Sequence, residues 1–252
     1  LSLNADAIRT KDFDWNISLN LAHNENEVTR LSNDVFTMDK ILLGDVFIRG
    51  GSSSGTHVLE EGRPIGQFYG LVCNGIDENG RYILVDKDGD GEISDPADYD
   101  YIGSAQPKLT YGITNSFRYK NFDLSFFLRG TIGNDILNAT RMAYAQSGFL
   151  PGTNALDDPL TYTLSETPRF SNYYLEKGSF MRLDNLTLGY KIKALNGIRV
   201  YFTAQNLFVI TKYKGLDPEV PMDSGDGLTP GVEPREFYPK ARTFSVGLNL
   251  NF

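Results

Sequence analysis

The chain has no long apolar run and almost no cysteine or histidine. Its 252 residues include a single cysteine, Cys73, and two histidines, His23 and His57. A lone thiol forms no internal disulfide, so cysteine usage leaves the redox compartment open. No stretch approaches the run of about 18 apolar residues that a membrane helix needs, which excludes an α-helical membrane protein. A membrane-spanning β-barrel is compatible with the mean hydropathy of −0.30, because half of each spanning strand is polar.

Excess basic charge and catalytic motifs are also lacking. The net charge is −8, whereas a nucleic-acid-binding surface requires a basic patch, so we expect no nucleic-acid partner. No phosphate-binding loop or dinucleotide fingerprint occurs. Neither histidine has a second His or Cys at metal-ligand spacing. We therefore expect no enzyme and no catalytic residue.

What the sequence does contain is strict alternation of apolar and polar residues. In residues 243–252, one face carries Phe244, Val246, Leu248, Leu250 and Phe252, and the other carries serine, glycine and asparagine. Residues 13–21 alternate in the same way. A period of two is that of a β-strand. An apolar face opposite small polar residues is typical of a strand with lipid on one side and a watery lumen on the other.

Weaker alternations extend this pattern to nine expected strands. They lie near residues 1–9, 13–24, 41–49, 57–65, 108–119, 122–130, 180–191, 198–210 and 243–252. Two of them fail at single positions, Asn115 and Phe127. Segments of two or three residues join neighbouring strands at 10–12, 120–121 and 195–197, whereas residues 25–40, 66–107, 131–179 and 211–241 form long segments rich in Gly, Pro, Asp and Asn. We expect an all-β, antiparallel transmembrane β-barrel with short periplasmic turns and long extracellular loops.

Nine strands with two open edges would leave backbone groups unpaired in hydrocarbon, which barrels avoid by closing. The chain also opens on an alternating stretch, without an initiator Met or a signal peptide. We therefore expect a C-terminal fragment. The remainder of the barrel would come from sequence before residue 1 or from another chain.

Several stretches, in their order and spacing, resemble the C-terminal region of SusC/RagA-type TonB-dependent outer-membrane transporters. The stretches are EGRPIGQFYGL (61–71), DKDGDGEIS (86–94), YIGSAQPKLTYGITNSFRYKNFDLSFFLRG (101–130), GNDILNATR (133–141), GSFMRLDNLTLGY (178–190), RVYFTAQNLFVITKYKGLDPEV (199–220) and YPKARTFSVGLNLNF (238–252). Together they cover essentially the whole chain.

The resemblance implies that residues 1–252 are the last nine or so strands of a plugged barrel of about 22 strands. The plug domain and the first strands would precede residue 1. It further implies TonB-dependent uptake of large nutrients, either oligosaccharides or peptides, across the cell outer membrane. The implied partners are a SusD-like surface lipoprotein that acts as a lid, TonB through the N-terminal region, outer-membrane lipid and the cargo.

One motif carries metal chemistry. Asp86, Asp88 and Asp90, followed by Gly91, match D-x-D-x-D-G, the first half of an EF-hand calcium loop. Alternate carboxylates surround a hard cation in such loops, and the glycine allows a sharp turn. The motif predicts a structural Ca²⁺ site in an extracellular loop.

The second half of this loop departs from the pattern. Glu92 would offer its backbone carbonyl and Ser94 would act directly or through water, but Ala97 stands at the twelfth position, where a bidentate acid belongs. Asp98 could serve after a one-residue insertion around Pro96. The alternative is an acidic, glycine-rich turn without metal. We favour calcium because three crowded carboxylates repel one another when no cation is present.

A different class of protein also fits the alternation, namely a secreted, calcium-stabilised β-sandwich that binds glycans or mediates adhesion. A sandwich would pack Phe244, Val246, Leu248 and Leu250 against a second sheet. A barrel would leave them exposed in an apolar band about 25 Å tall. Whether this face is covered or exposed therefore separates the two classes.

Overall fold

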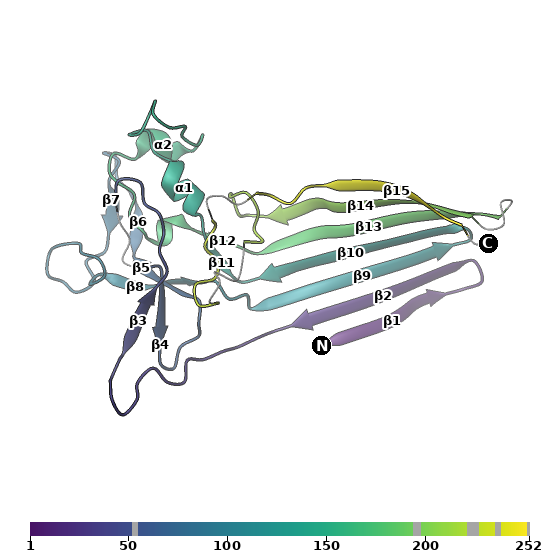
Figure 1. Ribbon diagram of the computed structural model, residues 1–252, viewed down its shortest axis with the longest axis horizontal. Coiled ribbons are helices and arrows are strands. Elements are labelled where there is room, and N and C mark those ends of the chain that lie inside the picture. The colour runs from purple at the N-terminus through teal and green to yellow at the C-terminus, as the bar shows by residue number, and fades with distance from the viewer. Residues whose placement is uncertain (52–54, 194–197, 221–226, 235–237, 251–252) are drawn as a thin grey trace.

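In the computed structural model the chain forms a long antiparallel sheet and a second folded unit at one end of it (Figure 1). The structure describes residues 1–51, 55–193, 198–220, 227–234 and 238–250. The terminal aromatic residue, Phe252, lies outside the described residues.

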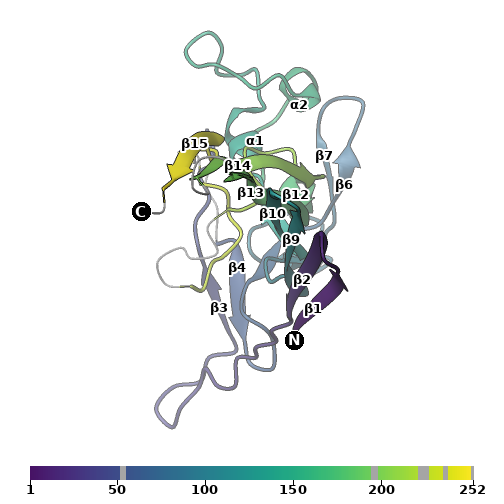
Figure 2. The ribbon, with the colours of Figure 1, turned by 90° about the vertical axis from the view of Figure 1, so that its right-hand side faces the viewer.

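The long sheet has seven strands in the order β1-β2-β9-β10-β13-β14-β15, all antiparallel to their neighbours. The strands are β1 (Ser2–Arg9), β2 (Phe13–Ala22), β9 (Leu109–Tyr119), β10 (Phe122–Ile132), β13 (Phe180–Ile192), β14 (Ile198–Thr211) and β15 (Thr243–Asn249). Seen end-on, they form a gently curved row, with β1 and β15 as its edges (Figure 2). The all-β antiparallel architecture expected from the alternation is confirmed.

The strand register sorts the alternating side chains onto two faces. Leu188, Phe202 and Val246 lie in line across β13, β14 and β15, and their side chains are 45%, 38% and 75% exposed. We call the face that carries this apolar row the outward face, and the opposite, polar face the inward face. In the described part of the chain no second sheet covers the outward face, and Phe244, Leu248 and Leu250 are exposed as well. The sandwich alternative is therefore wrong.

Two of the nine expected strands do not belong to the long sheet. Residues 41–49 and 57–65 contain only the short strands β3 (Lys40–Leu43) and β4 (His57–Glu60), which pair in a separate sheet, and β2 pairs directly with β9. A membrane-spanning strand needs about 9–11 residues, more than twice the length of either. Removing two strands leaves the direction of every other strand unchanged, so the expected up-and-down order holds for the remaining seven.

The long segments between the strands form the second unit, which we call the cap. It contains the sheet β3-β4-β5-β8, the pairs β6-β7 and β11-β12, and short helices. Its further elements are β5 (Gln67–Leu71), β6 (Cys73–Ile76), β7 (Tyr82–Leu84), β8 (Tyr99–Ser104), β11 (Asp135–Leu137), α1 (Ala139–Tyr144), α2 (Pro159–Thr163), the 3-10 helix Asn172–Tyr174 and β12 (Leu175–Lys177).

The cap has a hydrophobic core of its own. Phe68, Met142, Leu160, Phe170 and Tyr174 are almost completely buried in one cluster, although they are spread over more than a hundred residues of sequence. The expected long loops are therefore packed structure rather than open connections. None of the described helices has the length and apolar character needed to cross a membrane.

Candidate functional site

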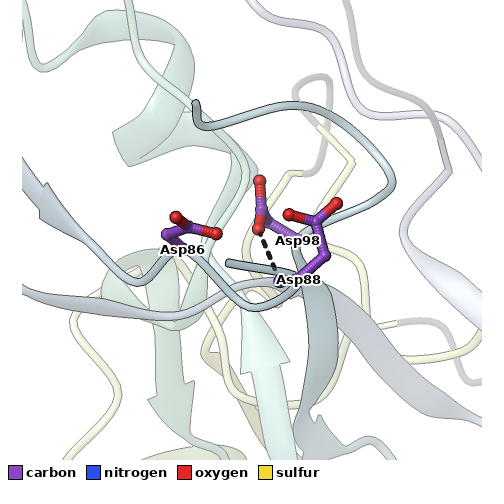
Figure 3. Close-up of side chains that lie close together, drawn as sticks. All are labelled: Asp86, Asp88 and Asp98. Atoms are coloured by element: carbon purple, nitrogen blue, oxygen red, sulfur yellow. Dashed lines mark hydrogen bonds between the residues drawn. The ribbon is translucent and has the colours of Figure 1, made fainter. Parts of the chain in front are cut away.

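The acidic motif lies in the cap, in the loop that joins β7 to β8 (Figure 3). Carboxylate oxygens of Asp86, Asp88 and Asp98 lie within 4.8 Å of one another. Because calcium–oxygen distances are about 2.3–2.6 Å, ligands on opposite sides of one ion are about 5 Å apart. The three carboxylates are thus close enough to contact a single ion.

Hydrogen bonds to the first aspartate shape the start of the loop. The Asp86 carboxylate accepts the backbone N–H groups of Gly89 at 2.6 Å and Gly91 at 2.9 Å. Both glycines have positive φ, +79° and +89°, a conformation that side-chain-bearing residues rarely adopt. The glycines of the motif therefore let the chain turn tightly around Asp86.

The last aspartate closes the loop. Asp98 is fully buried, and its carboxylate accepts the backbone N–H groups of Lys87 at 2.6 Å and Ser94 at 2.8 Å. A longer bond of 3.3 Å comes from the Asp88 N–H (Figure 3). Hydrogen bonds from Ser94 and Lys87 favour the ionised form and hold the pKa of Asp98 below its ordinary value. Asp98 thus stays charged and joins both ends of the loop.

The other predicted ligands lie elsewhere in the same loop. Asp90 accepts the Glu92 N–H at 2.8 Å, and both residues are exposed. The Asp90 carboxylate does not belong to the three-carboxylate group found among the described residues. The structure therefore brings together Asp86, Asp88 and Asp98, and a metal role for the six residues stays a prediction.

Sequence reasoning missed the residues that attach this loop to the cap. Arg169 donates to the Asp95 carboxylate at 2.5 Å, and Lys87 donates to Asp100 of β8 at 2.5 Å. Arg169 is separated from its partner by 74 residues, so no local pattern indicates the pair.

A second polar cluster, on the inward face, was also missed. Arg182 of β13 is 1% exposed and pairs with Asp217 at 2.5 Å, while also donating to Asn206 of β14. Arg129 of β10 contacts both oxygens of Glu219, at 2.5 and 3.0 Å. The two arginines therefore fasten the segment that follows β14 to the inward face. The only signal in the sequence is an arginine at a polar-face position near the cap end of each of the strands β10 and β13.

Glu219 lies at the centre of this cluster. Its burial opposes ionisation, but hydrogen bonds from Arg129 and Lys240 outweigh that effect and hold the pKa of Glu219 below its ordinary value. Lys240 approaches the carboxylate to 2.5 Å. A carboxylate between two cations stays ionised at neutral pH.

Two cavities lie beside this cluster. A cavity of about 450 Å³ is lined by Arg129, Glu219, Thr131 and Asn134, among others. A neighbouring cavity of about 540 Å³ shares part of its lining with the first, including Gln106. Their walls offer both hydrogen-bond donors and acceptors, which suits a polar ligand.

Comparison with known proteins identifies relatives over the whole chain. No family model matches it. The chain is 36% identical over 270 residues to TonB-dependent receptor SusC of Bacteroides thetaiotaomicron, covering 100% of this chain and 26% of that protein. It is 32% identical over 297 residues to TonB-dependent receptor P3 of Formosa agariphila, covering 100% of this chain and 28% of that protein.

Solved structures agree with this relationship. The structure of the RagAB peptide transporter matches 98% of this chain and 28% of the compared chain, with a TM-score of 0.74 and 25% sequence identity. The chain thus spans about a quarter of the length of the relatives it matches. The chain is therefore a homologue, over its whole length, of part of the SusC/RagA-type TonB-dependent receptors, and its open antiparallel sheet with an exposed apolar face fits a piece of an outer-membrane β-barrel.

Proposed function

We propose that residues 1–252 form the C-terminal part of a TonB-dependent importer that carries large nutrients across the outer membrane. The observation that carries this proposal is the match of the whole chain to TonB-dependent receptor SusC at 36% identity. The exposed apolar rows of the outward face supply physical support, because lipid is the surrounding that such a face favours. The proposed activity is binding and gated passage of cargo, without bond-making chemistry.

The proposed orientation places the cap outside the cell and the short turns in the periplasm. The turns at residues 10–12 and 120–121 lie at the end of the sheet opposite the cap (Figure 1). Since the edges β1 and β15 cannot remain unpaired in hydrocarbon, further strands from the same chain or another chain would close the barrel. A plug domain and the TonB-contacting segment would belong to the sequence before residue 1.

The proposed partner on the cell surface is a SusD-like lipoprotein that closes over the cap. The proposed cargo is an oligosaccharide or a peptide. The name of the RagAB relative, a peptide transporter, supports a peptide, and the name of the SusC relative states no cargo. The cavity beside Arg129 and Glu219 offers donors and acceptors with which either cargo could form hydrogen bonds.

Two measurements on the intact receptor in cells test the proposal. Uptake of labelled oligosaccharides and peptides should fall to background when TonB is deleted, and uptake that persists without TonB would overturn the transport proposal. Orientation is tested with a membrane-impermeant maleimide. Ser147→Cys, exposed in the cap, should react on intact cells, whereas Lys11→Cys, exposed in a short turn, should react only after permeabilisation. The reverse pattern would contradict the orientation.

We also propose that the β7–β8 loop binds a structural Ca²⁺ ion. The favouring observation is the convergence of Asp86, Asp88 and Asp98, whose oxygen donors are those a hard cation prefers. Asp90, Glu92 and Ser94 would complete the ligand set. The bound ion would neutralise the negative charge of the three carboxylates. Backbone N–H groups already donate to Asp86 and Asp98, and the ion would add to their stabilising effect. Calorimetric titration of the calcium-depleted protein should show saturable heat on adding CaCl₂, and a titration without saturable heat would contradict this site.

A further inference from the structure

The short-turn end of the sheet carries a cluster of aromatic side chains on its outward face. Tyr119, Phe122 and Tyr190 are 52%, 50% and 40% exposed, and the rings of Phe122 and Tyr190 lie 4.6 Å apart. The register aligns these residues across β9, β10 and β13. Such rings are typical of the level where hydrocarbon meets lipid headgroups.

The same end of the sheet has an excess of basic charge. Residues 9–14, 118–123 and 190–199 contain seven basic and three acidic side chains, in a chain whose net charge is −8. Two of the acids, Asp14 and Asp123, already pair with arginines. Lys11, Lys120 and Lys191 are exposed, and none of them forms an ion pair with a described carboxylate. This end of the sheet therefore presents uncompensated positive charge.

Lys120 connects the basic charge to the aromatic cluster. Its ammonium nitrogen lies 5.3 Å from the centre of the Tyr119 ring, which belongs to the outward face. The Lys120 backbone has φ of +54°, a region that favours glycine and asparagine. The local turn geometry therefore gives no reason for a lysine at this position, whereas its placement over an outward ring gives one.

Hydrogen bonds connect the turn that contains Lys120 to the turns on either side of it. The Lys120 N–H donates to the Asp12 carbonyl, and the Lys191 N–H donates to the Asn121 carbonyl, both at 2.9 Å. The ends of neighbouring hairpins are thus hydrogen-bonded into one row. Lys191 pairs with the inward-facing Arg199, so its side chain belongs to the inward face, and the charge beside the aromatic cluster centres on Lys120. Lys11 belongs to the neighbouring turn, two strands away, and stands about 10 Å from Lys120 along the row.

We propose that this row, centred on Lys120, binds the phosphate of an anionic phospholipid headgroup. The ammonium groups supply hydrogen bonds and charge to the phosphate, while the Tyr119, Phe122 and Tyr190 rings contact the glycerol region and the upper acyl chain. Under the orientation proposed above, on which this assignment of the leaflet rests, the lipid belongs to the inner leaflet of the outer membrane. The observations favour a lipid over a protein partner because the Lys120 ammonium, which pairs with no described carboxylate, lies over the ring of Tyr119, which belongs to the outward aromatic cluster.

The test uses the intact receptor in nanodiscs that contain phosphatidylethanolamine and phosphatidylglycerol in both leaflets. Native mass spectrometry after gentle release measures the ratio of the two lipids retained on the protein. Phosphatidylglycerol should be enriched on the parent protein, and Lys120→Gln should reduce the enrichment on the order of fivefold, as expected for one lysine near a lipid surface. The matched control is Lys212→Gln, which removes an exposed lysine near the cap end of the sheet and should leave the ratio unchanged.

Lys120→Arg tests whether the positive charge itself binds the lipid. This variant keeps the cation and should therefore keep the enrichment of phosphatidylglycerol. Heat-modifiable mobility in gels verifies that each variant is folded. Equal lipid ratios for the parent and Lys120→Gln would overturn the proposal, as would an equal loss in Lys212→Gln. Because both leaflets have the same composition, the result does not depend on which end of the protein faces the periplasm, so it is independent of the orientation and transport tests.

Discussion

The ring of Tyr201 on β14 lies directly across from Gly247 on β15, where a Cβ atom would stand 2.3 Å from the ring. The pair lies on the inward face. Phe127 covers Gly112 of β9 in the same way, and the Arg199 guanidinium extends over Gly189 of β13 to reach Asp123. Inward-facing glycines therefore provide the space in which large side chains lie flat against the sheet, and the rings in turn shield the exposed glycine backbone.

This geometry predicts that Gly247→Val disrupts pairing of the last strand. The valine would overlap the Tyr201 ring, and the ring would have to leave its position, at a cost of about 1–3 kcal/mol for overpacking. We expect a lower folded fraction of the intact receptor, measured by heat-modifiable gel mobility. Ser245→Val, on the same face of β15, is the control and should fold normally. Full rescue of Gly247→Val by Tyr201→Ser would confirm that the ring causes the defect; absence of rescue would contradict it.

Asn115 is a polar residue in the middle of the outward apolar row, and it has a defined partner. The Trp15 indole N–H donates to its side-chain oxygen at 3.0 Å. Trp15→Phe keeps an aromatic ring but removes the donor, so we expect a loss of about 1 kcal/mol, the usual size of such bonds in membranes. Thermal unfolding of the intact receptor measures the loss. Adding Asn115→Leu should remove most of the penalty, and an equal effect of Trp15→Phe in both backgrounds would exclude the hydrogen bond as its cause.

Asn115 and Phe127 also show why the long sheet was predictable from sequence. Both interrupt an alternation, yet the pairing of β9 with β10 keeps its register past them, because Asn115 has a local partner and Phe127 lies against Gly112. On the other side of β10, the pairing with β13 shifts between Phe127 and Leu128. By contrast, the prediction that residues 41–49 and 57–65 are barrel strands was wrong, because β3 and β4 show no alternation that marks a spanning strand. Val58 and Leu59 are consecutive and both buried, because this short strand is packed on two faces inside the cap. A short apolar run of this kind carries no periodicity that distinguishes a cap strand from a spanning one.

The candidate site likewise has one part that the sequence predicts and another part that it does not. The acidic motif is local, with ligands at alternate positions, and sequence alone indicated Asp86 and Asp88 as well as Asp98 after an insertion. The pairing of Arg182 with Asp217, by contrast, depends on how a segment 35 residues away folds back onto the sheet. No spacing rule links two such residues. The local grouping of carboxylates was predictable, whereas contacts made by the fold were not.

Removing one partner of the buried Arg182–Asp217 pair should release the segment that follows β14. Asp217→Asn removes the closer of the two carboxylates beside the buried guanidinium and leaves Glu219, 3.3 Å from Arg182 Nε, as its remaining counter-ion, so we expect a penalty of about 3 kcal/mol, the lower end for a broken buried pair. Limited proteolysis of the intact receptor should then show faster cleavage within residues 212–220. The control, Asp14→Asn, breaks a pair whose Arg118 side chain is 71% exposed and should change stability by less than about 1 kcal/mol. Equal effects of the two variants would contradict the importance of burial.

Acid should release the same segment without mutation. The pKa of Glu219 is lower in the folded protein than in the unfolded chain, so its ionised form stabilises the fold above the unfolded pKa of about 4.3. That contribution is lost as the pH falls below the unfolded pKa and then passes through the lower pKa that Glu219 has in the folded protein. Proteolysis at residues 212–220 should therefore accelerate only below about pH 4.3. In Glu219→Gln the acceleration of proteolysis by acid should be smaller. An unchanged acceleration would assign the effect to another carboxylate.

Asp98→Asn tests the acidic loop most directly, because Asp98 is both a proposed calcium ligand and the residue that closes the loop. The amide keeps the size of the side chain but loses one acceptor oxygen and the negative charge. We expect weaker calcium binding in calorimetric titration and, even without calcium, a looser loop, since the Lys87 and Ser94 N–H groups lose their charged acceptor. Asp90→Asn, at an exposed position outside the three-carboxylate group, should weaken binding much less. Hydrogen exchange of residues 86–98, with and without calcium, separates the two roles. Loop protection that drops in Asp98→Asn but never responds to calcium in the parent would leave Asp98 as a loop-closing residue alone and exclude the metal site.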